Sequence, residues 1–371
     1  LFESTNAERF TSLAAELGVP GAADEALAEL RGGLERGETV DWVASRGEHI
    51  SARVIAAAAG ARFIETGQVL GIDSRGLPTP ESYDRLAAVL AGDDLCLIPG
   101  YYGQGPDGRV KVFSRGGSDI TGAVVARAAG ATVYENWTDV SGFMMADPRL
   151  VPDARPMREV TYAELRELSY MGASVLHEEA IFPVKEAGIP INIRNTNAPQ
   201  EPGTMIVPQR EATETPVVGV AGKPSFSVIY LYKNLMNKEL GFGRRVLGIL
   251  ESHGVSYEHT PTGIDSMSVV VADDELGDRA DALREELVQS LHVEECSIAS
   301  DLALVTVVGV GMAHQVGIAA RCFGALAEAG VNVRMISQGV GELNIVVGVA
   351  REDFGPAVNA LYHAFVKPLT A

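Results

Sequence analysis

The chain has 371 residues, enough for two or three domains with sizeable cores. Its hydrophobic content of 46% argues against intrinsic disorder. The formal net charge is −19 and no Lys/Arg-rich run is present, which argues against a polyanionic partner such as nucleic acid or an anionic lipid surface. The composition therefore favours a small-molecule substrate.

Cysteine usage and hydropathy bear on the compartment. Cys96, Cys296 and Cys322 are far apart and odd in number, so they predict neither a disulfide framework nor a zinc site. Residues 1–10 lack a basic region followed by an apolar run, and no stretch reaches the roughly 18 apolar residues of a membrane span. We expect a soluble, cytoplasmic protein.

The first clear element is a helix over residues 39–59, where small and apolar side chains recur at helical spacing. Glu48 falls off this inward stripe. The inward positions are Val43, Gly47, Ile50, Val54 and Ala58.

Short β-like runs then alternate with helix-like segments. This alternation predicts an α/β domain with a largely parallel sheet. The β-like runs are residues 61–65, 95–98 and 110–114, and the helix-like segments are residues 81–90 and 120–129.

The next elements lead to a domain boundary. Thr161 and Glu164 have the spacing of a capping box, which starts a helix. A second helix ends near Gly188, and a strand follows over residues 189–194. Residues 199–208 are rich in proline, and we place the main boundary there.

Beyond the boundary the chain repeats itself with an offset of 76 residues, as Gly241 and Gly317 show. Each copy reads strand, helix, strand, strand, helix, and a βαββαβ order is the ferredoxin-like unit. One unit alone leaves a sheet face or edge uncovered, so we expect pairing between repeats or between chains. The predicted domains are residues 1–208, 223–298 and 299–371, the last together with a strand at 216–222.

The sharpest local signal is a strand-to-helix turn at Arg115, Gly116 and Gly117. The helix is expected to begin at Ser118 or Asp119, with Ser118 as its cap. Free N–H groups at a helix start favour an anion, and Arg115 can bind a carboxylate or phosphate through two parallel hydrogen bonds. The alternative is an ordinary turn with a solvated arginine.

Residues 103–108 match the pattern G-x-G-x-x-G, but they precede a strand, whereas a dinucleotide fingerprint opens a helix. We interpret them as a hairpin or an active-site loop. His49 and His177 have no partner at metal-ligand spacing and are expected to be structural.

Polar residues follow the β-like run at 132–135. Thr138 and Asp139 come first, and Asp147 and Arg149 lie in the loop beyond. Open α/β sheets bind ligands at the carboxyl ends of their strands. Taken alone, Asp139 and Asp147 are more typical of turn formers than of ligand-binding residues, because Asp is favoured in turns for its local hydrogen bonding.

Several motifs in order resemble the aspartokinase family: GEHIS at 47–51, RGGSD at 115–119, WTDVSG at 137–142, ADPR at 146–149, MGASVLHEEAIFP at 171–183 and GIPINIRNTNAPQEPGT at 188–204. The resemblance implies an amino-acid-kinase α/β fold, a largely parallel sheet covered on both faces. The duplication is similar to the two ACT domains, of ferredoxin-like βαββαβ order, that follow in that family. The implied reaction moves the γ-phosphoryl group of Mg-ATP to the side-chain carboxylate of aspartate.

The resemblance also implies roles for individual residues. Arg115 would clamp the α-carboxylate of aspartate, and Glu48 would bind its ammonium group. Ser118 and Asp119 would lie beside the transferring phosphoryl group, with Asp119 organising the basic groups around it. Gly116 and Gly117 would let the backbone approach the substrate. The residues implied for the nucleotide pocket are Thr138, Asp139, Phe143, Met144, Asp147 and Arg149.

Two departures from the family stand out. Its members open with a strand and a K-F-G-G-[ST]-S loop, and nothing like it precedes Glu48. Either the sequence begins roughly 60 residues late, from typical element lengths, or the chain is not an active kinase as it stands. Many members also carry Lys-Val-Leu-His-Pro where this chain has Ser174 at the lysine position.

In the repeats, the loop at 237–243 can present backbone N–H groups to the carboxylate of an effector amino acid. Glu258 could bind its ammonium group, and the loop at 314–318 would pair with the first loop. The alternative is that both loops only cap helices. Lysine and threonine are the candidate effectors. The implied effector residues are Met236, Gly241, Phe242, Glu258, Gln315, Val316, Gly317 and Ile318.

The first hypothesis is therefore a feedback-regulated aspartate kinase, with a homodimer formed through the ACT domains as the default assembly. A catalytically silent, amino-acid-binding regulatory subunit is the alternative from another class. A related kinase acting on glutamate or UMP is a third possibility.

Overall fold

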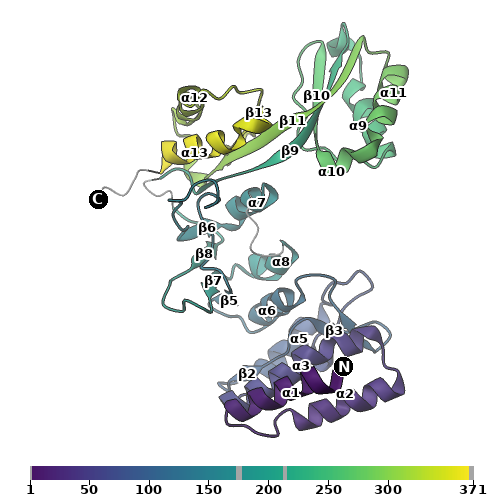
Figure 1. Ribbon diagram of the computed structural model, residues 1–371, viewed down its shortest axis with the longest axis vertical. Coiled ribbons are helices and arrows are strands. Elements are labelled where there is room, and N and C mark those ends of the chain that lie inside the picture. Colours follow the sequence, from purple (N-terminus) through teal and green to yellow (C-terminus); the bar gives the residue numbers. More distant parts are fainter. Residues whose placement is uncertain (1, 173–177, 212–214, 367–371) are drawn as a thin grey trace. The chain divides into compact units, whose positions relative to one another are not determined.

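The structure, a computed structural model, describes residues 2–172, 178–211 and 215–366 (Figure 1). It divides into two compact units. The first comprises residues 1–141 and 175–208, and the second comprises residues 142–174 and 209–371. Ser174 and His177 lie outside the described residues.

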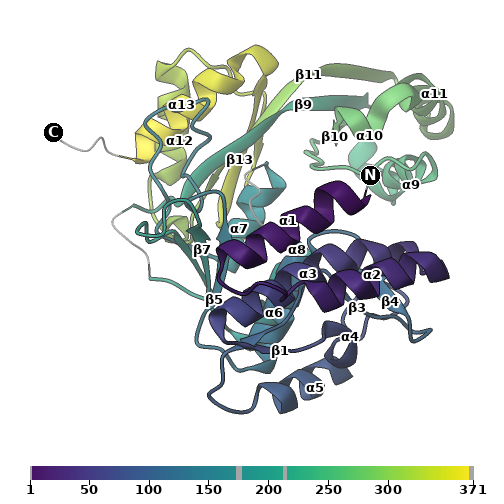
Figure 2. The same cartoon turned by 60° about the horizontal axis from the view of Figure 1, so that its bottom comes forward.

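Three helices open the first unit and lie side by side (Figure 2). They are α1 (Phe2–Glu16), α2 (Asp24–Arg36) and α3 (Val40–Ala59). The helix expected at 39–59 is confirmed: Thr39 caps α3 by accepting the N–H of Trp42, and Gly60 ends it in the left-handed conformation. Helices α1 and α2 were not among the predicted elements.

The inward positions predicted for α3 are only partly correct. Ile50 and Val54 are fully buried, but Gly47 and Ala58 are exposed. Arg46 and His49 are buried instead, at 3% and 2% exposure. The burial of these two polar side chains is possible because partners from distant segments satisfy their hydrogen bonds.

The rest of the first unit alternates short strands with helices, as expected. Strand β1 pairs parallel with β2, and β5 pairs parallel with β7, which pairs antiparallel with β8. Strands β3 and β4 form an antiparallel hairpin around residues 105–109, which confirms the hairpin interpretation. The elements are β1 (Arg62–Phe63), α4 (Thr66–Val69), α5 (Glu81–Leu90), β2 (Cys96–Leu97), β3 (Tyr102–Gln104), β4 (Val110–Val112), α6 (Gly117–Ala128), β5 (Tyr134–Thr138), α8 (Glu178–Ala187), β7 (Ile191–Asn195) and β8 (Thr204–Val207).

The second unit contains one antiparallel sheet in the order β10-β9-β11-β13-β12. Helices α9, α10 and α11 lie beside one end of this sheet, and α12 and α13 lie beside the other (Figures 1 and 2). The elements are β6 (Glu159–Thr161), α7 (Tyr162–Tyr170), β9 (Gly219–Tyr232), α9 (Phe242–Ser252), β10 (Ser266–Ala272), α10 (Asp273–Leu276), α11 (Ala280–Leu291), β11 (Glu295–Val308), α12 (Ile318–Glu328), β12 (Met335–Ser337), β13 (Asn344–Ala350) and α13 (Phe354–Phe365).

The two repeats share the long strands β9 and β11. Residues 226–232 of β9 pair with the first half of β11, and residues 219–223 pair with its second half. Each half of the sheet has its own apolar core, one around Val269 and Leu287 and one around Val347 and Leu361. One sheet therefore covers the edges that a single repeat would leave open.

One expected strand of the first repeat is missing. The segment between α9 and β10 forms only isolated bridges, His259 to Val270 and Thr262 to Met267. Pro261 lies between them, and proline has no N–H to donate to a strand ladder. The corresponding strand of the second repeat, β12, does form.

Across the described ranges, none of the helices has the length and apolar character that crossing a bilayer requires. All three cysteines are free.

Candidate functional site

The start of α6 is the centre of the candidate site. Helix α6 begins at Gly117, and Gly116 precedes it with a left-handed φ of 58°. The prediction that Ser118 caps this helix is wrong, because Ser118 lies within the first turn and no side chain caps α6. Since no side chain occupies them, the first N–H groups of α6 can bind an anion.

Two glycines let a neighbouring loop pack tightly against this helix start. A Cβ atom on Gly117 would lie 2.8 Å from Cβ of Phe113 and 3.0 Å from Cα of Tyr101. A Cβ atom on Gly100 would lie 3.0 Å from Cα of Ser118. Gly117 is therefore required by packing inside the protein.

Tyr101 in that loop has a positive φ of 79°, which costs energy for a bulky residue. Its backbone is held at both ends: its N–H donates to Thr121 Oγ1 at 3.3 Å, and its carbonyl accepts the N–H of Phe113 at 3.0 Å. The loop is thereby fixed against the first turn of α6.

The charged residues of this turn differ in their surroundings. Arg115 is exposed and makes no ion pair with any carboxylate in the described part of the chain. Asp119 is partly buried, and its Oδ1 accepts a hydrogen bond from Asn136 Nδ2 at 2.9 Å. Asn136 was not among the predicted site residues; the signal for it was its place in a strand, two residues from Thr138 and therefore on the same face.

The carboxyl ends of β5 and β7 meet at one edge of the parallel pair. Thr138 had been expected to follow the strand. Strand β5 in fact runs through Thr138, so this residue lies inside it. The N–H and hydroxyl of Thr196 both donate to the Thr138 carbonyl at 2.9 Å. Asn195 Nδ2 donates to Ser141 Oγ at 2.9 Å. Asp139 is exposed at this edge, where open α/β sheets bind ligands.

Glu48 lies on α3 beside a buried polar cluster. His49 Nδ1 is 2.9 Å from Glu65 Oε2, and Tyr102 Oη donates to Glu65 Oε1 at 2.8 Å. Arg53 Nε donates to His49 Nε2 at 3.0 Å, so Nε2 accepts and Nδ1 is the ring nitrogen that faces Glu65. His49 is thus a structural residue, as expected.

The protonation states of the cluster follow from its burial and hydrogen bonds. Burial alone would raise the pKa of Glu65, but the hydrogen bonds from His49 and Tyr102 outweigh it and the pKa is lowered. Burial raises the pKa of Tyr102, which therefore stays neutral and donates. Glu48 is solvent-accessible, yet the surrounding protein atoms raise the pKa of its carboxyl. Tyr102 follows Tyr101, so two consecutive tyrosines connect this part of α3 to the start of α6.

The remaining nucleotide candidates belong to the second unit. Arg149 donates from Nε and Nη2 to the carboxylate of Asp147, at 3.0 and 2.6 Å, and these hydrogen bonds lower the pKa of Asp147. The side chain of Phe143 is buried at 3% exposure. Met144 is partly buried and forms a bridge with Pro156.

The two candidate effector loops have the same local structure. Gly241 precedes α9 and Gly317 precedes α12, both in the left-handed conformation and both without a capping side chain. Helix-start N–H groups are therefore available in both repeats. Met236, Phe242 and Ile318 are buried, whereas Gln315 and Val316 are exposed.

Glu258 lies in the segment between α9 and β10. It accepts a hydrogen bond from Tyr170, and burial together with this bond raises the pKa of Tyr170. Glu258 Oε2 is buried and has no hydrogen-bond partner among the described residues. A buried carboxylate oxygen without a partner is suited to a cationic group.

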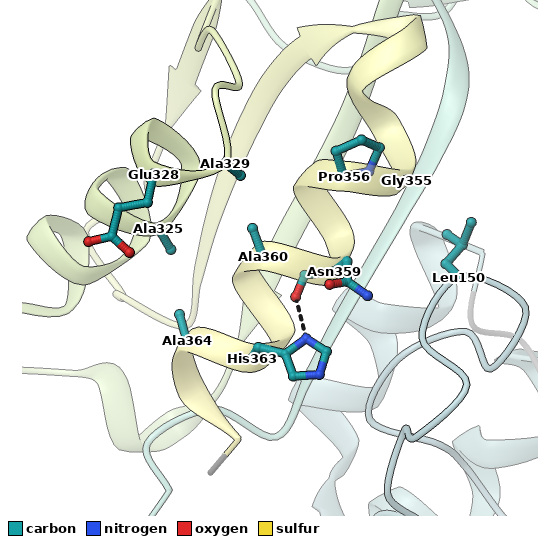
Figure 3. Close-up of a pocket in the computed structure, with 10 residues that line it drawn as sticks. All are labelled: Leu150, Ala325, Glu328, Ala329, Gly355, Pro356, Asn359, Ala360, His363 and Ala364. Carbon is teal, nitrogen blue, oxygen red and sulfur yellow. Dashed lines mark hydrogen bonds between the residues drawn. The ribbon is translucent and has the colours of Figure 1, made fainter. Parts of the chain in front are cut away.

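A surface pocket of the second unit lies between α12 and α13 (Figure 3). Small side chains such as Ala325, Ala360 and Ala364 line it, with Glu328 and His363 at its margins. His363 Nδ1 donates to the Asn359 carbonyl at 2.9 Å, and Nε2 lies 3.2 Å from Asp153 Oδ2. None of the sequence motifs contributes its predicted site residues to this pocket, so it is not part of the candidate site.

Two family models match different parts of the chain. The family model described as the amino acid kinase family matches residues 13–195. A family model described as an ACT domain matches residues 305–365.

Individual relatives narrow the family. Aspartokinase 3 of Bacillus subtilis (strain 168) is 45% identical over 287 residues, which cover 77% of this chain and 63% of that protein. The bifunctional aspartokinase/homoserine dehydrogenase of Haemophilus influenzae is 33% identical over 285 residues, which cover 75% of this chain and 35% of that protein. The chain thus spans less than two thirds of the length of these curated relatives.

Solved structures extend the comparison. The aspartate kinase of Clostridium acetobutylicum superposes with a TM-score of 0.88 at 44% identity, covering 97% of this chain and 83% of that one. Aspartokinase III of E. coli in complex with lysine and aspartate, in the T-state, gives a TM-score of 0.71 at 26% identity, covering 93% and 80%. On the strength of these similarities, the chain belongs to the aspartate kinase family.

Proposed function

We propose that the protein transfers the γ-phosphoryl group of ATP to the side-chain carboxylate of L-aspartate. The product is 4-phospho-L-aspartate, which opens the biosynthesis of lysine, threonine and methionine. The observation that carries this proposal is the uncapped start of α6, with Asp119 held by Asn136 and with Arg115 beside it, which makes no ion pair among the described residues. A helix start and a free guanidinium group suit a substrate with one carboxylate to hold and another to phosphorylate.

Each residue of the site has a role that fits its surroundings. Arg115 binds the α-carboxylate of aspartate, and Glu48 binds the ammonium group. Ser118 and Asp119 lie beside the transferring phosphoryl group, and the N–H groups after Gly116 and Gly117 take up its negative charge. The attacking carboxylate is already ionised at neutral pH, so the rate rests on positioning and charge neutralisation and needs no strong base.

The nucleotide pocket is the second part of the proposal. Its residues are Thr138, Asp139, Phe143, Met144, Asp147 and Arg149. Mg²⁺ is expected to arrive bound to the phosphates of ATP, as the family resemblance implies, because phosphate oxygens are ligands that Mg²⁺ prefers. An E. coli relative was solved in complex with aspartate and ADP, which supports nucleotide binding in this family.

Regulation is the third part. We assign a kinase domain to residues 1–208 and two ACT domains to residues 223–298 and 299–371, the second with the strand at 216–222. Pairing of residues 219–222 with residues 305–308 supports the last assignment. The candidate effectors are lysine and threonine, and the lysine complex of the E. coli relative supports lysine. They would bind at Gly241, Gly317 and Glu258 in a cytoplasmic homodimer joined through the ACT domains.

The test is aspartate-dependent ADP release by the full-length gene product, measured with and without lysine and threonine. We expect activity that depends on aspartate and Mg²⁺ and that at least one of the two amino acids suppresses. Glutamate and UMP serve as control acceptors. Absence of activity together with tight amino-acid binding would overturn the kinase proposal in favour of a regulatory subunit.

A further inference from the structure

Asn136 joins strand β5 to Asp119 at the start of α6. Side chains alternate along β5, so Tyr134, Asn136 and Thr138 share one face. The opposite face carries Glu135 and Trp137, which engage Arg194 through an ion pair of 3.2 Å and a ring contact of 4.7 Å. Asn136 is thus separated from the exposed side of its own strand.

Both donors of the Asn136 amide are used. Nδ2 donates to Asp119 Oδ1 at 2.9 Å and to Tyr134 Oη at 3.0 Å. An ionised carboxylate only accepts hydrogen bonds, so the NH₂ group must face Asp119. The contact is charge-assisted, which makes it stronger than a bond between neutral groups.

Tyr134 makes a second contact between β5 and the start of α6. Its hydroxyl donates to the backbone carbonyl of Asp119 at 3.4 Å. Burial raises the pKa of Tyr134 to about 12, so it keeps its proton at neutral pH. A Cβ atom on Gly122 would lie 2.5 Å from Tyr134 Oη, so the glycine lets α6 lie directly on the ring.

We propose that Asn136 is a positioning residue for phosphoryl transfer, holding the Asp119 carboxylate in one orientation beside the transferring group. The proposal rests on the aspartate kinase function proposed above. Asn136 does not touch the substrate and acts through Asp119 alone.

The effect of this contact on the reaction follows from geometry. A carboxylate at the third position of a helix can rotate about its side-chain bonds, and only one orientation suits the basic groups around a phosphoryl group. Displacement of a catalytic group by about 1 Å can cost about 100-fold in rate. Loss of the Asn136 amide should therefore lower kcat and leave KM for aspartate and ATP nearly unchanged.

The test compares three variants of the full-length protein. Asn136→Ala removes the donor. Asn136→Asp keeps the shape but places a second carboxylate against Asp119. Glu135→Gln, on the exposed face of the same strand, is the matched control. Melting temperatures, kcat and both KM values are measured for each protein between about pH 6 and pH 9, a range that brackets neutrality.

The two Asn136 variants should differ in their dependence on pH. In N136A, kcat falls about 10- to 100-fold at every pH, since no donor remains. In N136D, two facing carboxylates share a proton at low pH, and the O–H group then replaces the lost amide donor. Its kcat therefore recovers towards the wild-type value as pH falls. A purely structural contact would lower the melting temperature without producing this recovery.

The outcomes separate the two proposals. Wild-type kcat in N136A, with an active wild-type enzyme, would overturn the positioning role and leave the kinase assignment intact. If the wild-type enzyme releases no ADP with aspartate, the proposed function fails, and the positioning role, which depends on it, fails too. If N136A does not fold, the pH profile of N136D decides, because that variant preserves the shape of the side chain. A flat profile for N136D relative to the wild type would also overturn the inference.

Discussion

The carboxylate of Glu164 accepts the backbone N–H of Val310 at 2.8 Å, although 146 residues separate them in the sequence. Glu164 is completely buried, and the same carboxylate also accepts the N–H of Thr161 and two hydrogen bonds from Arg210, at 2.9 and 2.6 Å. Val310 opens the segment that leads to Gly317, one of the candidate effector positions. The Glu164 side chain thus connects the start of α7 to the second repeat through hydrogen bonds.

Two further residues of α7 contact the repeats. Glu167 Oε2 accepts a hydrogen bond from Asn344 Nδ2 at 2.5 Å, and Tyr170 bonds to Glu258. Glu164, Glu167 and Tyr170 are spaced by three residues, so they lie along one face of the helix. Helix α7 belongs to the segment that the amino acid kinase family model matches, and all three contacts reach the repeats.

Arg210→Met should destabilise the second unit by about 3 kcal/mol, since removing one partner of a buried ion pair leaves a charge without compensation. The Arg210 side chain is only 4% exposed. Chemical unfolding followed by the fluorescence of the protein measures the change. Arg334→Met is the control, because the pair of Arg334 with Asp301 is more exposed and should contribute at most about 1 kcal/mol. Equal destabilisation by both variants would show that burial of the Glu164 pair has no special effect.

The Glu164 network should also make stability depend on pH. Burial alone would raise the pKa of Glu164, but the hydrogen bonds from Arg210 and from the backbone of Thr161 and Val310 outweigh it, and the pKa is lowered. Its stabilisation is therefore fully present above the ordinary glutamate pKa of about 4.3 and is lost as pH falls through the folded-state pKa.

Urea unfolding of the wild type and of Glu164→Gln, at several pH values from about 6 down to about 3, measures this loss. The free energy of unfolding should fall more steeply with acid in the wild type. The gap between the two proteins should narrow as pH decreases. A gap that stays constant over the range would contradict the ionised state of Glu164 in the folded protein.

Local patterns predicted the elements that depend on neighbours in sequence. The helix at residues 81–90 matches α5, and the Thr161/Glu164 capping box is present with both of its hydrogen bonds. The 76-residue repeat predicted two similar units, because the same spacing of glycines at helix starts recurs in both. These features are encoded within a few residues of where they act.

Contacts between distant segments were not predictable in the same way. Arg46 and His49 can be buried because Trp42, Tyr102 and Glu65 contact their polar groups. Tyr102 and Glu65 lie outside helix α3. Asn136 matters because the fold brings β5 against the start of α6. No spacing in one sequence reveals such a partner, so motif reasoning found Asp119 and not the residue that holds it.

Replacement of Arg115 should weaken aspartate binding. Arg115→Ala removes two charge-assisted hydrogen bonds to the α-carboxylate in the proposed site, and KM for aspartate should rise about 10- to 100-fold while KM for ATP changes little. Steady-state kinetics with each substrate varied in turn measures the two constants. Arg109→Ala, an exposed arginine of the β3–β4 hairpin, should leave both unchanged. A larger effect on ATP than on aspartate would move Arg115 to the nucleotide side of the site.

Glu48 should make aspartate binding sensitive to acid. In the proposed site its carboxyl binds the substrate ammonium only when ionised, and burial raises its pKa. KM for aspartate should therefore begin to rise at a higher pH than an ordinary glutamate would produce. Glu48→Gln should have a high KM with little dependence on pH. If the two proteins show parallel pH profiles, another group causes the dependence.

The contacts of α7 should carry part of the response to the effector. Asn344→Ala removes the hydrogen bond to Glu167, and neither residue is among the proposed substrate residues. We expect nearly normal aspartate kinase activity and an inhibitory concentration of lysine or threonine raised about 5- to 100-fold, the range that a coupling free energy of about 1–3 kcal/mol allows. Effector binding itself, measured by calorimetry, should remain.

Asn359→Ala is the matched control, because Asn359 lies on α13 and lines the pocket in Figure 3. This variant should respond to the effector as the wild type does. Inhibition of N344A at wild-type effector concentrations would mean that Glu164 and Tyr170 are sufficient to connect α7 to the repeats. In that case the double variant with Tyr170→Phe, which also removes the bond to Glu258, should lose the response that the single variant retained.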